Sequence, residues 1–356
     1  MTKLCSFLFA VIVIGGAIVL GITVNLEGPG ILRGMVNEST TLASAPLLRR
    51  TATIEVPGPA GKRFDYAVID PSKHLLFSTH LAANQLYVIR LPDNKVVKTV
   101  PNLPGIEAVE LVPQMNQAYT SDWWENKIGI IDLESLAIIK KLPTEDKPDG
   151  IAYAADFHKI YVSDERAKAE AVIDVTKDEI VTTLHFDSET GMPQYDPVTR
   201  RIYVNLQDRD ELVEIDPGSD TIAARYPVAR CRGNHGMALD PEHRRAFLSC
   251  EGNDQMIVFD LQTHATIAAL PMARGADVIK FDPGTRRIYV ACGSGAISIF
   301  QQEDADHYRK LGDAPVAEKV HSLAIDPATH RIYAPEEQEN GRAVARIAVY
   351  EPVLAR

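Results

Sequence analysis

The chain has 356 residues, of which 46% are hydrophobic and 24% are charged. Its 37 basic and 48 acidic residues give a formal net charge of −11 at pH 7. Because such a chain repels phosphate groups and anionic lipids, the composition disfavours nucleic acid and membrane surfaces as partners.

An apolar segment opens the chain. Residues 4–24 are apolar or small without interruption, and Lys3 precedes them. This run is long enough to span a bilayer, whereas a cleaved signal peptide has an apolar core of about 7–15 residues. We expect residues 1–25 to be either a signal peptide or a membrane anchor, and residues 26–50 to be a spacer. In both cases the rest of the chain is exported, either to the periplasm or as a membrane-anchored protein that faces outward.

The rest of the chain, residues 51–356, repeats one short pattern, an Asp-Pro turn followed by a basic-apolar-aromatic strand. The aromatic residues of the seven copies are separated by 42 to 44 positions: Phe77, Tyr119, Tyr161, Tyr203, Phe247, Tyr289 and Tyr333. A period in the low forties, with several short strands in each unit, is typical of propeller blades. The pattern predicts an all-β fold, a single seven-bladed β-propeller.

Each repeat divides into four strands. In the fourth repeat they are expected at residues 192–196, 201–206, 211–216 and 221–226. The last repeat ends after three strands, while residues 51–56 match the outermost strand of the other repeats. We therefore expect this N-terminal strand to complete the last blade, which removes the free sheet edges.

These residues carry a family resemblance. The segments 160–163, 202–205 and 288–291, together with the Asp-Pro turns and residues 148–152, resemble the YVTN-repeat β-propeller family. The resemblance implies the fold and an exported protein, in a family whose members mostly have no assigned function. Some relatives are linked to single-stranded DNA binding and others sit beside redox enzymes. The family motif builds blades, so no catalytic residue is carried over.

Residues at equal offsets from the aromatic anchors form rings on one face of a propeller. Twelve positions before the anchors, six of seven residues are ionisable: Asp65, Glu107, Asp149, His235, Asp277 and His321, with Gly191 as the exception. Three positions after the anchors lie His80, Asp122, Asp164, Leu206, Cys250, Cys292 and Glu336. We expect the first set to line the mouth of a central channel and the polar members of the second to form an outer tier above it.

Such a mouth has the ligands for a divalent cation. The oxygen-rich set Asp65, Glu107, Asp149 and Asp277 would suit Ca²⁺ or Mg²⁺, while His235, His321 and the thiols of Cys250 and Cys292 would suit a transition metal. The alternative is a polar, water-filled opening without an ion. No compact metal motif such as CxxC or HExxH decides between them.

Three cysteines follow the apolar segment: Cys231, Cys250 and Cys292. An odd number in an oxidising compartment leaves at least one thiol unpaired if a disulfide forms. The sequence allows two alternatives, a Cys231–Cys250 disulfide within one blade or free structural thiols.

Trp123 and Trp124 are the only tryptophans of the chain, and they follow the second strand of the second repeat. Tryptophan is enriched at binding hot spots, so the pair is a candidate contact site for a ligand or partner. The alternative is that one ring plugs its own loop.

The predicted function is an exported binding or scaffold module that acts through the acidic and histidine-lined mouth, as a monomer, on a small ligand or an exported protein. A binding role is favoured over an enzyme, and the membrane is contacted only through the N-terminal segment. The first rival is a metal-dependent propeller hydrolase of the lactonase type. The second, single-stranded DNA binding, comes only from the family resemblance.

Overall fold

A computed structural model of the protein describes residues 13–14, 17–18 and 46–354. The chain divides into two compact units, Met1–Ser44 and Ala45–Arg356. In the first unit only β1 (Val13–Ile14) and β2 (Ala17–Ile18) are described, and they pair antiparallel. The predicted leader and most of the predicted spacer therefore lie outside the described residues. No helix among the described residues is long and apolar enough to cross a membrane.

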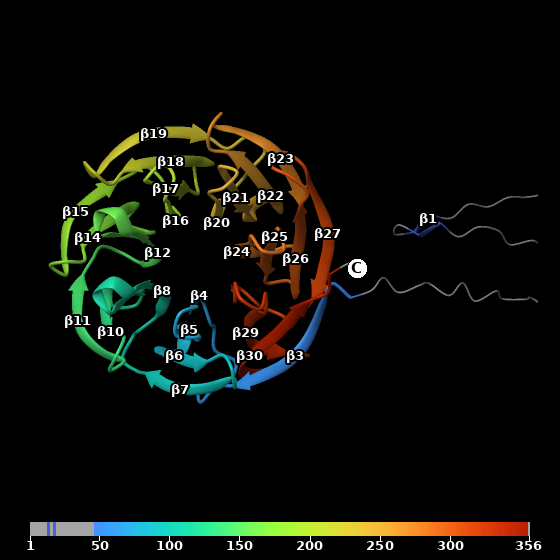
Figure 1. Ribbon diagram of the computed structural model, residues 1–356, viewed down its shortest axis with the longest axis horizontal. Helices are drawn as coiled ribbons and strands as arrows, with labels where there is room; N and C mark the ends of the chain where they lie inside the picture. Colours follow the sequence, from blue (N-terminus) through green and yellow to red (C-terminus); the bar gives the residue numbers. More distant parts are fainter. Residues whose placement is uncertain (1–12, 15–16, 19–45, 355–356) are drawn as a thin grey trace, which may run out of the picture. The chain divides into compact units, whose positions relative to one another are not determined.

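The second unit is a ring of seven four-stranded antiparallel sheets, the predicted seven-bladed β-propeller (Figure 1). Six sheets are built from four consecutive strands that run from the centre of the ring to its rim. The first three are β4 (Ala67–Asp70), β5 (Leu75–His80), β6 (Gln85–Arg90) and β7 (Lys95–Val100); β8 (Ile106–Val112), β9 (Gln117–Asp122), β10 (Lys127–Asp132) and β11 (Ala137–Pro143); and β12 (Pro148–Ala154), β13 (Lys159–Asp164), β14 (Ala169–Asp174) and β15 (Glu179–His185).

The next three sheets follow the same plan. They are β16 (Thr190–Asp196), β17 (Arg201–Leu206), β18 (Glu211–Asp216) and β19 (Thr221–Pro227); β20 (Asn234–Asp240), β21 (Arg245–Cys250), β22 (Gln255–Asp260) and β23 (Ala265–Pro271); and β24 (Ala276–Asp282), β25 (Arg287–Cys292), β26 (Ala296–Gln302) and β27 (Tyr308–Pro315). Four single-turn 3₁₀ helices join strands: η1 (Leu81–Ala83), η2 (Pro113–Met115), η3 (Ala155–Phe157) and η4 (Glu251–Asn253). The strands of the fourth repeat match the predicted ones to within two residues.

The seventh sheet closes the ring. It consists of β28 (Ala324–Ile325), β29 (Ile332–Glu339), β30 (Arg342–Pro352) and, from the N-terminal side, β3 (Leu48–Glu55). β3 pairs antiparallel with β30 from Leu48 opposite Pro352 to Glu55 opposite Arg346. The predicted closure is confirmed, and the closing strand begins at Leu48, so it takes in the last residues of the predicted spacer.

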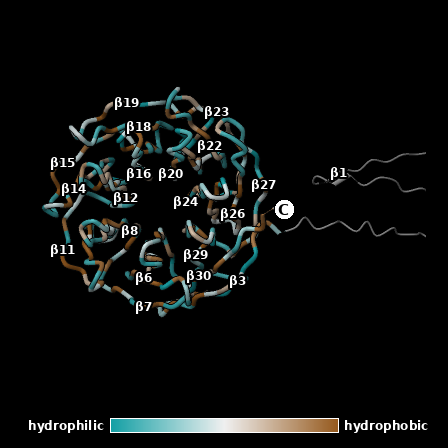
Figure 2. Tube along the Cα trace, in the orientation of Figure 1, coloured by the Kyte–Doolittle hydropathy of each residue, from teal (hydrophilic) through white to brown (hydrophobic). Residues whose placement is uncertain are grey.

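The seven aromatic anchors lie in the second strand of each blade and are almost completely buried. Hydrophobic residues recur in every blade around the ring (Figure 2). A buried tyrosine needs a partner for its hydroxyl, and two anchors find one in the neighbouring blade. Tyr119 donates to Asp178 at 2.5 Å, and Tyr161 donates to Asp220 at 2.6 Å. Tyr119 and Tyr161 therefore pack within their own sheets and also join them to the next blade.

Removing residues 1–57 is expected to destabilise the whole ring, because β30 loses its partner and the buried side chains of Ile54 and Val56 are lost. Burial of two such side chains alone contributes about 3–6 kcal/mol. Thermal unfolding followed by circular dichroism measures the effect. A variant that begins at Pro46 keeps β3 and is the matched control. Equal melting temperatures for the two variants would contradict this account of ring closure.

Candidate functional site

One cavity gathers all six ionisable residues of the first predicted ring. It has a volume of about 350 Å³, and its walls include Asp65, Glu107, Asp149, His235, Asp277 and His321. Four of them are the second residues of innermost strands: Glu107 in β8, Asp149 in β12, His235 in β20 and Asp277 in β24. Asp65 and His321 come just before β4 and β28. We call this space the acidic cavity.

A local irregularity turns these side chains toward the acidic cavity. In each of β8, β12, β20 and β24 the register with the next strand shifts at or directly after the ionisable residue. A bulge adds a residue to one strand and re-aims its side chain. Close approach of neighbouring strands accompanies the bulges: a Cβ on Gly236 would lie 2.4 Å from the backbone oxygen of Asp277. Glycine is therefore required at this point of the ring.

Four further wall residues were missed by the sequence analysis because they lie four positions after the anchors rather than three: Leu81, Glu165, Gln207 and Glu251. Trp123, which was predicted as a contact residue on other grounds, has the same offset. The residue at position three is the last of its strand and the residue at position four is the first beyond it. Successive residues of an extended chain point to opposite sides, so a shift of one position exchanges a buried residue for one that lines the cavity.

His80, which the sequence analysis proposed as a ligand-binding residue, does not line the acidic cavity. Its ring stacks on Phe64 with the ring centres 3.8 Å apart, and its two nitrogens contact the Tyr87 hydroxyl at 3.0 Å and the Lys62 carbonyl at 3.1 Å. Burial lowers the pKa of His80 to about 4, against a smaller opposing effect of the Lys62 carbonyl. The imidazole is a neutral packing element.

Asp122 and Asp164 also lie away from the cavity walls. Asp122 is buried 3.1 Å from the Lys141 ammonium, and Asp164 accepts hydrogen bonds from the Thr144 hydroxyl at 2.6 Å and from the Glu145 amide at 3.2 Å. Burial raises the pKa of each carboxyl to about 7, although these partners lower it. Both hold neighbouring chain segments in place.

The remaining members of the expected outer tier have structural partners as well. Glu336 is buried between Arg50 and Arg346, with oxygen–nitrogen distances of 3.0 and 2.7 Å. Cys250 is in a disulfide, and Cys292 is a buried free thiol. The structure therefore does not bring the outer tier together around the acidic cavity.

Negative charge dominates the acidic cavity. Its walls carry six carboxyl groups, from Asp65, Glu107, Asp149, Glu165, Glu251 and Asp277, against Arg63 and two histidines. Arg63 lies 2.7 Å from Asp65 and 3.9 Å from Asp277. Burial, followed by the nearby carboxylates Asp65 and Asp149, raises the pKa of Glu107 well above its usual value. Like charges enclosed together favour the neutral acid or a bound cation.

Asp277 differs from Glu107 because two histidines flank its carboxyl group. Its two oxygens lie 3.3 Å from His235 Nε2 and 3.5 Å from His321 Nδ1. Burial opposes ionisation, but the two histidines lower the pKa of Asp277 below its usual value. Burial alone would lower the pKa of His235, whereas Asp277, Asp149 and Glu165 raise it to about 10. Asp277 thereby holds both imidazoles in fixed orientations.

Among the described residues, one group of three side chains could hold a metal ion: Asp149, Glu165 and His235, with ligand atoms within 4.8 Å of one another. This trio shares only Asp149 with the expected set of Asp65, Glu107, Asp149 and Asp277. The difference has a physical cause, because Asp65 is paired with Arg63 and Asp277 with the two histidines.

Tyr66 also lines the acidic cavity. Its side-chain hydroxyl is buried and has no hydrogen-bond partner in the described structure. Burial, and then the charges of Asp149 and Asp277, raise the pKa of this hydroxyl well above its usual value. The group is a neutral donor that faces the carboxylates, and the repeat pattern gave no signal for it.

The two tryptophans contribute aromatic surface to the cavity wall. Trp124 is 51% exposed, and a Cβ on Gly105 would lie 2.6 Å from its Cγ, so the indole rests directly on the glycine backbone. Trp123 has the Lys147 ammonium 5.4 Å from its ring centre. Both indoles line the acidic cavity.

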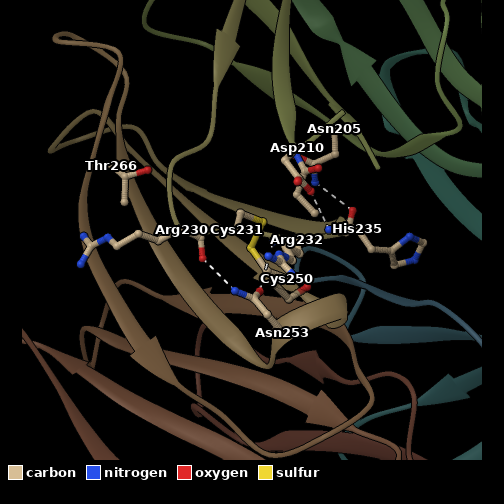
Figure 3. The surroundings of a disulfide bond; sticks show 12 residues. Asn205, Asp210, Arg230, Cys231, Arg232, His235, Cys250, Asn253 and Thr266 are labelled. Carbon is tan, nitrogen blue, oxygen red and sulfur yellow. Dashed lines mark hydrogen bonds between the residues drawn. A yellow bond between two sulfur atoms is a disulfide. The ribbon is translucent and has the colours of Figure 1, made fainter. Parts of the chain in front are cut away.

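A disulfide joins Cys231 to Cys250, with the Cα atoms 5.4 Å apart (Figure 3). It ties the loop before β20 to the end of β21, and Asn253 adds a hydrogen bond to the Arg230 carbonyl at 2.9 Å. Asn205 in the preceding blade donates to the His235 carbonyl at 2.8 Å. The disulfide and these hydrogen bonds together fix the segment that carries His235.

Comparison with protein-family models and with curated proteins finds no match to this chain. Solved structures do match its fold. The hydrazine synthase of Kuenenia stuttgartiensis aligns with a TM-score of 0.70 at 14% identity, over 84% of this chain and 97% of that chain. U3-55K aligns with a TM-score of 0.72 at 12% identity, over 87% and 100%, and the WD40 repeats of RRP9 with 0.72 at 13%, over 87% and 98%. At these identities the likeness shows the seven-bladed propeller fold alone.

The neutral state of His80 predicts a direct observation. In a histidine-selective NMR titration its ring should titrate near pH 4, whereas His307, whose pKa is raised by Asp304, should titrate well above it. Because an unfolded histidine has a pKa of about 6.5, His80 stabilises the fold above pH 6.5. This contribution is lost as the pH falls through 6.5 toward 4. A His80 midpoint near 6.5 would show that the ring is solvated.

The disulfide predicts a redox-dependent stability. Reduction is expected to lower the free energy of unfolding by about 3 kcal/mol, the entropy of closing a loop of this size. Denaturant unfolding with and without reductant measures the change. The double variant Cys231→Ser, Cys250→Ser is the control and should not respond to reductant. A wild-type protein that does not respond either would show that the bond is absent.

Proposed function

We propose that this protein is an exported β-propeller binding module whose ligand carries positive charge and binds in the acidic cavity, at the mouth of the central channel. The observation that carries the proposal is the wall composition: six carboxyl groups face one arginine and two histidines within one cavity. Burying carboxylates together is unfavourable unless a cation relieves the repulsion. A cationic ligand is the occupant that this arrangement stabilises.

The aromatic wall supports the same proposal. Trp123 and Trp124 lie beside the carboxylates in the acidic cavity. Indole faces attract cations, and tryptophan supplies much of the contact energy in binding sites. The combination suits a small organic cation, a basic side chain of a protein partner, or a metal ion. It does not suit the phosphate backbone of single-stranded DNA.

Export is supported by two independent features. The apolar residues 4–24 have the length of a membrane-spanning or signal segment. The Cys231–Cys250 disulfide is a bond that persists in oxidising compartments and is rare in the cytosol. Membership of the YVTN-repeat family is proposed on the recurring segments 160–163, 202–205 and 288–291, and it agrees with an exported protein.

The fluorescence of the two tryptophans can report ligand binding, because the chain has no others and both line the acidic cavity. Titration with spermidine or trilysine is expected to change the tryptophan emission saturably, with an affinity that falls as salt rises. Citrate and triglutamate, the anionic controls, should produce no saturable change.

Charge-removing variants test where the cation binds. The double variant Glu165→Gln, Glu251→Gln is expected to weaken binding on the order of tenfold, because two carboxylates leave the cavity. Glu179→Gln, on the exposed start of β15, is the matched control and should bind as the wild type does. If no cation, organic or inorganic, gives a saturable response with the wild-type protein, the proposed function is wrong.

A further inference from the structure

We propose that Asp149, Glu165 and His235 form a binding site for one divalent transition metal ion in the acidic cavity, with the Tyr66 hydroxyl as an additional polar contact. The inference rests on the proposed function, because it names the cation that the cavity binds. It differs from the oxygen-only site expected from the sequence in both its ligands and its metal.

The three ligands come from separate parts of the ring. Asp149 is the second residue of β12, Glu165 directly follows β13 of the same blade, and His235 is in β20, two blades along. Their ligand atoms lie within 4.8 Å of one another. Zinc bonds to oxygen and nitrogen are about 2.0–2.2 Å long, so small side-chain rotations bring all three onto one ion.

The blade between those of Asp149 and His235 allows the strands to pack closely. Gly191 in β16 is the one member of the ring that is not ionisable, and it lies between Asp149 and His235 in the order of the blades. A Cβ at this position would lie 2.8 Å from the His235 backbone oxygen. The missing side chain therefore lets the strand that carries His235 pack closely against β16.

Tyr66 provides the independent observation. Tyr66 is 6% exposed and lines the same cavity as the three proposed ligands. Its hydroxyl has no hydrogen-bond partner among the described residues. A buried polar group without a partner costs about 1–3 kcal/mol, so structures rarely keep one unless something else satisfies it. An oxygen of a small ligand on the ion would accept a hydrogen bond from the Tyr66 hydroxyl.

Polar residues around the trio hold the ligands in place. A metal-bound histidine commonly donates its second ring N–H to a carboxylate, and Asp277 lies 3.3 Å from His235 Nε2. Gln207 donates to Glu165 at 3.1 Å. The disulfide and Asn205 fix the backbone around His235. These contacts orient two of the three ligands before an ion arrives.

The ligand set selects the metal. Calcium takes 6–8 oxygen ligands and magnesium keeps most of its waters, so neither gains from an imidazole. Imidazole suits Zn²⁺ and other transition metals, and a given site generally binds Zn²⁺ more tightly than Mn²⁺. We therefore expect the order Zn²⁺, then Mn²⁺, then Mg²⁺ and Ca²⁺. Three protein ligands also leave a coordination position for an exogenous molecule.

Isothermal titration calorimetry of the full chain, purified without a polyhistidine tag, tests the inference with ZnCl₂, MnCl₂, MgCl₂ and CaCl₂. The expected result is one Zn²⁺ per chain, bound at least tenfold more tightly than Mg²⁺ or Ca²⁺. Glu165→Gln should weaken Zn²⁺ binding at least tenfold, while Tyr66→Phe should weaken it by a smaller factor. Far-UV circular dichroism confirms that each variant is folded.

Glu251→Gln is the charge-matched comparison, because it removes one carboxylate from the same cavity but not from the trio. It should weaken Zn²⁺ binding less than threefold. Equal losses in Glu165→Gln and Glu251→Gln would overturn the assignment, since general attraction to a negative cavity would then explain the binding. A preference for Ca²⁺ or Mg²⁺ over Zn²⁺ would overturn it as well.

The two proposals fail separately. If Zn²⁺ and Mn²⁺ do not bind but spermidine or trilysine changes the tryptophan emission, the metal site is wrong and the cation-binding module stands. If neither a metal ion nor an organic cation binds, both proposals are wrong.

Discussion

The pairing of β3 with β30 is the constraint on which the rest of the structure depends. A sheet of three strands would leave β30 with a row of unpaired backbone groups, and the ring would be open at that blade. Once β3 is in place, seven sheets surround one axis and their innermost strands lie around the centre (Figure 1). The acidic cavity exists only because these strand starts converge, so closure at one side fixes the site at the centre.

Convergence has an electrostatic consequence. A repeat that places a carboxylate or an imidazole at the same offset in most blades brings them together in the folded ring. Part of the repulsion is relieved within the cavity, since Asp65 is paired with Arg63 and Asp277 with two histidines. Burial raises the pKa of Asp149 and Glu165, while the shared His235 and, for Glu165, also Arg166 lower it. Both proposals place the bound cation beside Asp149 and Glu165, the acids that lack an ion pair of this kind among the described residues.

The fold could be predicted closely because its signals are local and repeated. The spacing of anchors such as Tyr161 and Tyr203 counts the blades, and the missing fourth strand of the last repeat identifies residues 51–56 as the closing strand. The ends of the strands could be predicted because turn-forming residues flank each apolar segment. None of these inferences depends on a contact between specific side chains.

The site was predicted only in part. Six wall residues were found because equal offsets in a repeat lie on one face, as with Asp149 and Asp277. Glu165 was missed because one step past the strand end reverses the direction of the side chain. The neutral, stacked state of His80 depends on its contact with Phe64, and the disulfide depends on a Cα separation, neither of which a sequence pattern specifies.

The central claim is that the acidic cavity binds a cation between Asp149, Glu165 and His235. The most direct measurement is a crystal structure of the protein soaked in MnCl₂, with anomalous diffraction data to locate the metal. The account predicts one strong anomalous peak in the cavity, within bonding distance of oxygens of Asp149 and Glu165 and of a ring nitrogen of His235. A cavity without a peak, or a peak bound instead by Asp65 and Glu107, would contradict it.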